Sequence, residues 1–534
     1  MKRGLWGLVA VLLAGVAHAR PNVLIIIADD LGYSDVGAFG GEIHTPNIDA
    51  LAREGVQLTS FHTATNCSPT RAMLLTGTDN HLVGLGNSAE VMQLRAPEYL
   101  IYPGHEGYLN FATSTLPELL RAAGYRTYMT GKWHLGLEAH TSPHARGFER
   151  TFALLDGAAN HFNNSEVVPQ MGETTYRADG ALTALPDDLY SSRDYARRLA
   201  AFLREDRDSD APFFAYLAFT APHWPLQAPE ASIAKYRGAY DAGYEVLFER
   251  RLARQKALGL TDEAVEGQPP LPGSTGWDEL SDEERRYSAR LMEVYAAMVD
   301  DMDRYIGEVI ATLKEIGAYD DTIILFMSDN GAEGADAGRA EVFRRFVEAC
   351  CDNSYANMGR ASSYLFYGHH WARAGTVPSR LFKSTTAEGG IRSPAIVRHP
   401  GAAGGRRYDG FLSVLDVMPT VLELAGVAHP KSSLPLKGAS FVSVLKGEDE
   451  AVHGSDYVMG WEFSGHRALR KGRWKIVYTM PPLGDRRWRL HDVLADPSEQ
   501  RDLSATEPEV MKELLAEWDL YVARHGVVLE PLKP

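Results

Sequence analysis

Three apolar segments of this chain each end in a short run of polar residues. They cover 22–28, 213–219 and 322–327, and the first contains Val-Leu-Ile-Ile-Ile. The polar runs that follow them are Asp29-Asp30, Thr220-Ala221-Pro222-His223 and Ser328-Asp329-Asn330. Continuous apolar runs of this length are typical of strands buried in a parallel sheet. Because open α/β sheets place their sites at the carboxyl ends of such strands, the sequence predicts an α/β protein with a site at one sheet edge.

Helical periodicity adds two elements to this sheet. One helix is predicted over 46–54, and a much longer one over 281–317, where apolar residues recur at helical spacing. Ser281 followed by Glu284 resembles a capping box, which marks the start of the long helix. The segment 261–280 is rich in Pro, Gly and acidic residues, so we expect it to be a surface excursion.

A change of composition near 430–455 indicates a second, smaller unit. Its predicted elements are strands within 467–478 and 488–493 and an amphipathic helix over 508–524. We therefore expect a signal peptide over 1–19, a large catalytic domain over 20–440, and a small α+β domain over 441–534.

The first 19 residues have the composition of an export signal. Lys2 and Arg3 form a basic start, 7–16 is apolar, and Ala17-His18-Ala19 fits a small-x-small cleavage pattern. The apolar stretch is shorter than the roughly 20 residues that a spanning helix needs. An uncleaved anchor is the alternative explanation. We expect a mature chain that is periplasmic or secreted and has no membrane span.

Charge and cysteine content argue against two further protein classes. The formal charge of −16 argues against a nucleic-acid partner, because polyanion binders usually carry a basic face. Three cysteines in 534 residues do not make a disulfide scaffold. Cys350 and Cys351 are adjacent, a spacing that strains a mutual bridge, so we expect free thiols there.

The polar residues at two of the strand ends offer only oxygen ligands. Asp29 and Asp30 follow one strand, and Asp329 and Asn330 follow another. Three carboxylates and one amide suit a hard cation, calcium or magnesium, better than zinc or copper. Each pair alone is more typical of a turn, because Asp and Asn are common turn residues. Two such pairs in one α/β chain favour a metal site, provided that the strand ends meet.

A cysteine and an arginine lie near the start of a predicted helix. In Cys67-Ser68-Pro69-Thr70-Arg71, Pro69 is well placed to open the helix, with Cys67 just before it. Backbone N–H groups at a helix N-terminus favour an anion, and Arg71 lies one turn further on. Taken alone, a single cysteine among apolar residues is more often part of the core.

Two Lys/His pairs add groups that suit a tetrahedral oxyanion. Lys132 and His134 are two residues apart, so in an extended segment they share one side. His223 and Lys383 form a second pair elsewhere in the chain. Taken individually, Lys132 and Lys383 are more typical of solvated surface lysines, and a single histidine beside Pro222 is more typical of a structural residue.

Together these residues resemble the formylglycine-dependent (type I) sulfatases. Cys67 to Arg71 matches the family signature Cys-x-Pro-x-Arg, and Gly131 to Gly136 (Gly-Lys-Trp-His-Leu-Gly) matches the second signature. The resemblance extends from Asn22 into the C-terminal domain and is strongest toward bacterial arylsulfatases. The segments that carry it are 37–42, 143–149, 221–227 and 327–334.

The resemblance implies a fold, a modification and a metal. The fold is alkaline-phosphatase-like, an α/β architecture with a large mixed sheet flanked by helices, plus a small C-terminal α+β domain. A separate maturation enzyme would oxidise Cys67 to Cα-formylglycine, whose hydrated form attacks the sulfur of a sulfate ester. The implied ligands of one calcium ion are Asp29, Asp30, Asp329, Asn330 and the processed Cys67.

The same resemblance implies roles in the attack on sulfur. Arg71 and Lys132 would hold the hydrated side chain, and Lys132, His223 and Lys383 would contact the sulfate oxygens. Asp329 would take the attacking proton, and His223, with Lys383, would protonate the departing oxygen.

Release of sulfate is assigned by the resemblance to His134. It would take the proton of the second hydroxyl, so that the aldehyde reforms and sulfate leaves. A serine in place of the processed Cys67 could attack sulfur but has no second hydroxyl, which is the chemical reason for the modification.

Two other functions are compatible with the sequence. A phosphonate or phosphodiester hydrolase can share the signature and the fold, although such relatives tend to lack the full Lys and His set. A binding protein without catalysis would capture calcium or sulfate, but no catalytic residue is missing here.

The expected partners are a small sulfate ester, for which an aryl sulfate is favoured, and the formylglycine-generating enzyme. Aromatic residues within 333–375 could accept an aryl ring or simply pack.

Overall fold

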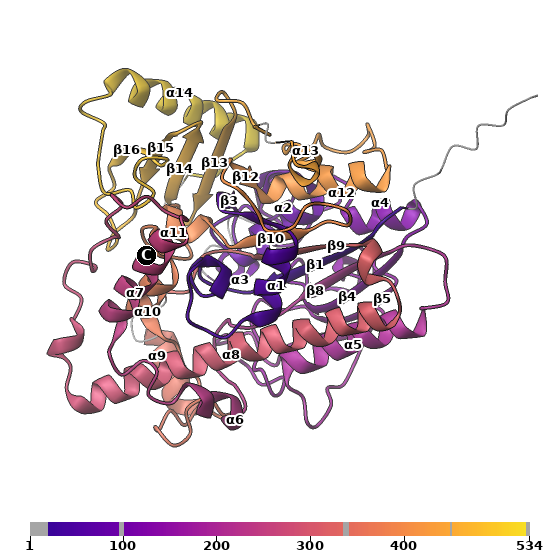
Figure 1. Ribbon diagram of the computed structural model, residues 1–534, viewed down its shortest axis with the longest axis horizontal. Helices are drawn as coiled ribbons and strands as arrows, with labels where there is room; N and C mark the ends of the chain where they lie inside the picture. Colours follow the sequence, from indigo (N-terminus) through magenta and orange to yellow (C-terminus); the bar gives the residue numbers. More distant parts are fainter. Residues whose placement is uncertain (1–19, 95–100, 335–340, 449–450, 530–534) are drawn as a thin grey trace, which may run out of the picture.

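The computed structural model describes residues 20–94, 101–334, 341–448 and 451–529 (Figure 1). The signal-like segment 1–19 lies outside these residues. A mixed sheet of ten strands forms the centre of the molecule. In sheet order its strands are β11 (Arg406–Tyr408), β2 (Val56–Leu58), β10 (Ala395–Arg398), β9 (Thr322–Ser328), β1 (Asn22–Ala28), β8 (Phe213–Ala218), β4 (Arg126–Lys132), β5 (Arg150–Leu154), β6 (Tyr176–Ala178) and β7 (Ala181–Leu182).

The five central strands, from β9 to β5, are parallel, and β10 runs antiparallel to β9. The three apolar segments predicted as strands are β1, β8 and β9, which lie side by side. Ala28, the last residue of β1, pairs with Ser328, the last residue of β9. The polar residues that follow these two strands therefore emerge next to each other. The alkaline-phosphatase-like fold expected from the sequence is confirmed.

Helices cover both faces of the sheet (Figure 1). The helices outside the C-terminal part are α1 (Pro46–Glu54), α2 (Cys67–Thr76), α3 (Ala89–Leu94), α4 (Leu116–Ala122), α5 (Ser191–Glu205), α6 (Glu230–Ile233), α7 (Tyr244–Ala257), α8 (Asp282–Glu315), α9 (Glu341–Cys350), α10 (Gly368–Gly375), α11 (Glu388–Ile391), α12 (Val417–Ala425) and α13 (Val442–Lys446). On one face α5 and α8 lie side by side, and on the other face lie α2, α4 and α12. Ser281 and Glu284 form the capping box expected at the start of α8.

Alternation along β1 divides the core into two layers. Leu24 and Ile26 pack with α5 and α8, whereas Val23, Ile25 and Ile27 pack with α2, α4 and α12. Successive side chains of a strand point to opposite faces, so a strand buried on both faces must be apolar throughout. That requirement explains the unbroken Val-Leu-Ile-Ile-Ile run.

The C-terminal part forms an antiparallel sheet of four strands covered by one helix. Its elements are β13 (Val458–Phe463), β14 (His466–Lys471), β15 (Trp474–Tyr478), β16 (Trp488–Asp492) and α14 (Pro508–His525). The segment 467–478 is a hairpin, and β13 was not predicted. A further short sheet joins β3 (Phe61–His62) to β12 (Leu412–Ser413). The boundary at residue 440 stays a prediction; α13, just beyond it, packs in the same core layer as α12.

Buried charges join the C-terminal sheet to the large sheet's domain. Lys475 on β15 is fully buried and pairs with Glu388 at 2.7 Å and Glu499 at 2.8 Å. Glu388 also contacts His62 at 2.9 Å.

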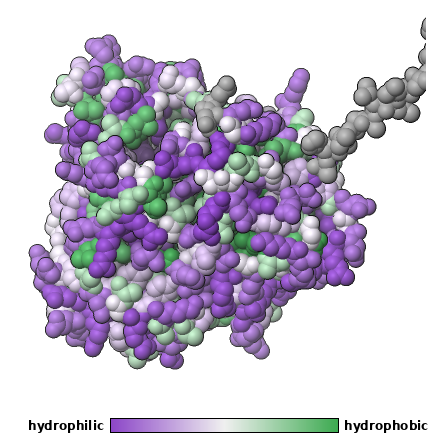
Figure 2. Space-filling view, in the orientation of Figure 1, coloured by the Kyte–Doolittle hydropathy of each residue, from purple (hydrophilic) through white to green (hydrophobic). Residues whose placement is uncertain are grey.

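The face in Figure 2 is mainly hydrophilic, with hydrophobic residues scattered across it. Among the described residues, no helix has the length and apolar character needed to cross a bilayer.

The two adjacent cysteines differ from expectation. Cys350 and Cys351 form a disulfide, so the prediction of free thiols was wrong. Cys350 is the last residue of α9 and Cys351 lies outside the helix. Helical backbone geometry therefore constrains only one of the two residues. Cys67 is a free, buried cysteine.

Candidate active site

The ends of β1 and β9 bring four oxygen-bearing side chains together. Asp29, Asp30, Asp329 and Asn330 are almost completely buried. The Asn330 amide donates a hydrogen bond to Asp30 Oδ1 at 2.7 Å, and the Asp30 N–H donates to Asp329 Oδ1 at 3.3 Å. Asp30 has a φ of 67°, a left-handed conformation that is uncommon for a residue other than glycine. The two pairs thus converge, as the metal-site prediction required.

Each of the three carboxylates is paired with its own buried cation. Lys132, the last residue of β4, donates to Asp29 Oδ2 at 2.7 Å. Lys383, in the loop between α10 and α11, donates to Asp30 Oδ2 at 2.8 Å. Arg71 of α2 donates twice to Asp329 Oδ2, at 2.9 and 2.7 Å, and once to the Lys132 carbonyl at 2.7 Å. We call these three ion pairs, together with Asn330, the carboxylate cluster.

Burial and ion pairing have opposite effects on the pKa values of the carboxylate cluster. It raises the pKa of the Asp29 carboxyl to about 7, against the opposing effect of Lys132. Burial alone would lower the pKa values of Lys132 and Lys383, but Asp29 and Asp30 beside them keep both above the usual 10.5. A buried carboxyl whose charged form is disfavoured is the condition that a bound cation relieves.

The carboxylate cluster also retains free oxygen ligands. Asp29 Oδ1 and Asn330 Oδ1 are buried and have no hydrogen-bond partner among the described residues. Asp29, Asp30, Cys67 and His223 each place a possible ligand atom within 4.8 Å of one another. Buried polar atoms normally have partners, and carboxylate and amide oxygens are typical ligands of hard cations. The residues present therefore fit a calcium or magnesium ion.

Cys67 lies beside this set of ligands, at the start of α2. The helix begins at Cys67 itself, so the expectation that Pro69 opens it was displaced by two residues. Asn66 caps the helix by accepting the Cys67 N–H at 2.9 Å. Cys67 Sγ lies 3.8 Å from Asp30 Oδ1. Pro69 is still tolerated, because N–H groups in the first helical turn have no intrahelical partner.

The Cys67 thiol is a poor nucleophile where it lies. Burial raises its pKa well above the model-compound value of 9.0, and the lysines of the carboxylate cluster do not compensate. The reactive form of a cysteine is the thiolate, which this environment disfavours. A nucleophile at position 67 would therefore have to be something other than the unmodified thiol.

The two histidines of the predicted site are both buried. His223 follows β8; its Nε2 lies 3.4 Å from Asp30 Oδ2 and its Nδ1 lies 2.7 Å from the Trp224 carbonyl. Burial, and then Lys383 and Lys132, lower its pKa well below 6.5. His134 lies just beyond β4 and contacts Glu90 of α3 rather than the carboxylate cluster.

Sequence reasoning missed two acidic residues of this region. Glu90 contacts His134, and Glu333 lies 3.1 Å from Lys383 Nζ and accepts from Trp224 Nε1 at 3.4 Å. Glu333 could have been predicted as a site residue, because it follows the end of β9 by only a few residues. Glu90 lies on a short helix with no strand end or motif beside it, so no sequence signal marked it.

A small cavity opens beside Asp30, and its other walls are largely apolar. They are formed by Pro222, Trp224, Leu226, Tyr295, Glu333, Phe366 and Tyr367. Phe366 and Tyr367 belong to the segment 333–375 that was considered for an aryl ring. Trp371 of the same segment is instead fully buried in the core against Tyr244 and Trp277.

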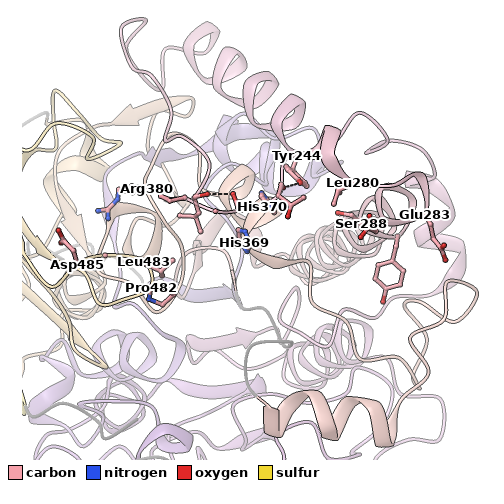
Figure 3. A pocket seen from close by; sticks show the side chains of 18 of the residues that line it. Tyr244, Leu280, Glu283, Ser288, His369, His370, Arg380, Pro482, Leu483 and Asp485 are labelled. Carbon is pink, nitrogen blue, oxygen red and sulfur yellow. Dashed lines mark hydrogen bonds between the residues drawn. The ribbon is translucent and has the colours of Figure 1, made fainter.

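A much larger cavity, of about 980 Å³, lies away from this chemistry. Figure 3 shows His369 and His370 between Tyr244 and Ser288 on one side and Leu483 and Pro482 on the other. None of the predicted site residues lines it. Size alone therefore does not identify the active site, and the carboxylate cluster remains the candidate.

Comparison with known proteins identifies the family of the chain. The Sulfatase family matches residues 21–427, and the C-terminal region of N-sulphoglucosamine sulphohydrolase matches 381–520. An uncharacterised sulfatase of Schizosaccharomyces pombe is 46% identical, covering 96% of this chain and 95% of its own length. An arylsulfatase of Klebsiella aerogenes is 39% identical, covering 83% of this chain and 97% of its own length.

Solved structures share the fold at lower identity. A complex of Ps i-CgsB with a neocarrahexaose is 23% identical, with a TM-score of 0.68 over 96% of this chain and 95% of that one. A phosphonate monoester hydrolase of Agrobacterium radiobacter is 20% identical, with a TM-score of 0.56 over 95% of this chain and 96% of that one. These likenesses concern the fold alone. The family match over most of the chain, the close relatives and the buried cluster around Cys67 lead to one conclusion: the chain belongs to the sulfatase family and is an arylsulfatase-like enzyme that hydrolyses sulfate esters.

Proposed function

We propose that the chain hydrolyses aryl sulfates to a phenol and sulfate, with formylglycine made from Cys67 as its nucleophile. The observation that carries the proposal is the carboxylate cluster itself, in which three carboxylates and three cations lie almost completely buried beside Cys67. Such a set offers oxygen ligands on one side and fixed positive charge on the other. A sulfate ester, which is a tetrahedral anion, requires both.

The modification and the metal would supply chemistry that the unmodified chain lacks. Hydrated formylglycine at position 67 would offer two hydroxyls on one carbon, one to attack sulfur and one to expel sulfate. Calcium held by Asp29, Asp30, Asp329 and Asn330 would lower the pKa of the attacking hydroxyl and neutralise charge on the sulfate.

The chain's own residues would position both reactants. Arg71 is fixed by Asp329 and by the Lys132 carbonyl, so its guanidinium would hold the side chain of residue 67 without reorganisation. Lys132 and Lys383 would hold the sulfate oxygens, where negative charge is greatest. Asp329 would accept the proton of the attacking hydroxyl.

Departure of the phenol requires a proton on its oxygen. The Nδ1 atom of His223 faces the Trp224 carbonyl, so Nδ1 carries hydrogen and donates to it. Nε2 of the neutral ring is then an acceptor, so it would first take a proton from the Lys383 ammonium, which shares Asp30 Oδ2 with it, and pass that proton to the departing oxygen. The aryl leaving group is supported by the 39% identical arylsulfatase of Klebsiella aerogenes; the cavity next to Asp30 has a volume of only about 10 Å³ and does not hold a ring as it stands. The basic and apolar start of the sequence supports export, so we propose that the enzyme acts outside the inner membrane.

The test compares substrates on protein expressed with and without a formylglycine-generating enzyme. We expect turnover of 4-nitrophenyl sulfate only with the maturation enzyme, and a peptide containing residue 67 that reacts with hydrazides. Cys67→Ala should be folded and inactive. Ser68→Ala is the matched control, because it changes a buried neighbour that the signature leaves open. Multiple turnovers by Cys67→Ala near the parent rate would overturn the proposal. Faster hydrolysis of bis(4-nitrophenyl) phosphate or of a sugar sulfate would overturn the aryl sulfate assignment.

A further inference from the structure

Glu90 and His134 form a hydrogen-bonded carboxylate–imidazole pair just beyond β4, whose last residue, Lys132, belongs to the carboxylate cluster. His134 Nε2 lies 2.9 Å from Glu90 Oε1 and 3.0 Å from Oε2. The His134 side chain is 6% exposed and that of Glu90 is 20% exposed. Glu90 comes from α3, far from both signature motifs in sequence. A carboxylate held this closely on a buried imidazole controls which ring nitrogen carries hydrogen.

Electrostatics define the protonation state of this pair. Burial would raise the pKa of Glu90, but His134 outweighs it and lowers that pKa to about 2. An ionised carboxylate can only accept hydrogen bonds, so Nε2 must carry the hydrogen. Burial lowers the pKa of His134 despite Glu90, which leaves the imidazole neutral at pH 7. The lone pair is then on Nδ1, which is buried and has no hydrogen-bond partner among the described residues.

The surrounding backbone accommodates the pair. His134 has a φ of 59°, in the left-handed region that non-glycine residues seldom adopt. Gly157 packs directly against both side chains: a Cβ there would lie 2.4 Å from Glu90 Oε1 and 2.5 Å from His134 Nε2. Any larger residue at position 157 would push the two groups apart. Strained backbone that persists at a site is typical of positions where geometry matters for function.

We propose that Glu90 is a positioning residue that holds His134 in the tautomer whose Nδ1 accepts a proton during sulfate release. This rests on the proposed function. The proton of the remaining hydroxyl on residue 67 moves to Nδ1, the carbonyl of that residue reforms, and the carbon–oxygen bond to sulfate breaks. Sulfate leaves with the bonding electron pair. Glu90 stays ionised and receives no proton, and its charge stabilises the imidazolium.

Several charged groups besides Glu90 act on His134. Lys132 and Arg71 both lower its pKa, and the Glu90 carboxylate is the group that opposes them. Asp156 lies beside Gly157 and is affected by Glu90; burial raises its pKa to about 6. Removing the charge of Glu90 leaves the two cations unopposed. The acid limb of the kcat profile, where His134 loses its proton, should therefore move to lower pH.

The kinetic test uses Glu90→Gln, Glu90→Asp and Gly157→Ala in the processed enzyme with 4-nitrophenyl sulfate. Release follows the attack, so slowing it lowers kcat and KM together and leaves kcat/KM nearly unchanged. We expect kcat to fall about 10- to 100-fold in Glu90→Gln, as for other groups that orient a catalytic side chain. Glu90→Asp should restore part of the loss. Gly157→Ala should show the same pattern without removing a titratable group.

Asp79→Asn is the matched control, because it alters another buried histidine–carboxylate pair, 2.9 Å to His81, outside the site. It should lower stability and leave kcat unchanged. A kcat for Glu90→Gln within about twofold of the parent would overturn the proposal. A parallel loss of kcat/KM would also overturn it, since that indicates damage to the attack step.

A second measurement does not depend on activity. Solid-state NMR of unprocessed protein with 15N-labelled histidine reports the His134 tautomer, assigned by comparison with His134→Gln. We expect hydrogen on Nε2 in the parent, and an imidazolium pKa that is lower in Glu90→Gln. Hydrogen on Nδ1 in the parent would overturn the proposal. If the processed parent shows no sulfatase activity, the proposed function fails, while the NMR result still decides whether Glu90 controls the tautomer.

Discussion

Asp79 and His81 form a buried ion pair that anchors the C-terminal domain beside the helix carrying Cys67. Their side chains lie 2.9 Å apart, just after α2, and the Tyr521 hydroxyl of α14 donates to Asp79 Oδ2 at 2.9 Å. His81 is 1% exposed. Because the pair is shielded from solvent, its effect on stability should depend strongly on pH.

The size of this effect follows from the two pKa shifts. Burial alone would lower the pKa of His81, but Asp79, and after it Glu462 at 3.9 Å, raise it from 6.5 to about 9. The same pair lowers the pKa of Asp79 from 3.8 to about 2, although burial opposes it. These shifts correspond to about 3 and about 2 kcal/mol, and both contain the Asp79–His81 interaction, so they are not added. The folded-state pKa of His81 exceeds its unfolded value. The stabilisation is therefore complete below pH 6.5 and is lost as the pH rises through about 9.

His81→Gln keeps a hydrogen-bond donor and removes the charge. We expect it to be about 2 to 3 kcal/mol less stable than the parent near pH 6, with the difference close to zero near pH 10. Calorimetric melting of both proteins at matched scan rates measures the gap in Tm at each pH. His140→Gln, at an exposed histidine, is the control and should give a small gap. A His81→Gln gap that stays constant from pH 6 to pH 10 would refute the reasoning.

Two further predictions concern the active site. Asp329→Ala should lose nearly all turnover and bind calcium more weakly, because it removes a charged ligand and the carboxylate that holds Arg71. Titration calorimetry with calcium checks this, and near-normal turnover of the parent after chelation would exclude the calcium assignment. His134→Ala should leave sulfate attached to the peptide containing residue 67 after substrate is added, as seen by mass spectrometry. If this variant fails before any sulfate is attached, the role in release is wrong.

Strand ends were the most predictable part of the molecule. A strand that is apolar at every position is stable only when both of its faces are buried, so β1, β8 and β9 were identifiable from the sequence. The parallel arrangement of these strands places Asp29 next to Asp329. The long helix α8 was predictable because its capping residues and apolar stripe are local features.

Other features depend on contacts that no local pattern records. Glu90 reaches His134 through tertiary packing of α3, and β13 is recognisable as a strand only beside β14. The Cys350–Cys351 disulfide was judged from strain at adjacent residues, whereas it forms where the helix ends. No local sequence pattern predicted which cation pairs with each carboxylate. Lys132, Lys383 and Arg71 come from a strand, a loop and a helix that are distant in sequence.

This pairing resolves a conflict inherent in the site. A cation site needs several carboxylates close together, and a site that cleaves an anionic ester needs cations at the same place; burial makes either set alone costly. Here Lys132 occupies one oxygen of Asp29 and Lys383 one oxygen of Asp30, while Asp29 Oδ1 has no hydrogen-bond partner among the described residues and faces Arg71 Nη2 only at 3.7 Å. In the proposed function a cation would bind at that oxygen while Lys132 stays on Oδ2. The same ion pairs that hold the carboxylates in position also hold the lysines beside Cys67, so the charges that a sulfate ester meets are already oriented before it binds.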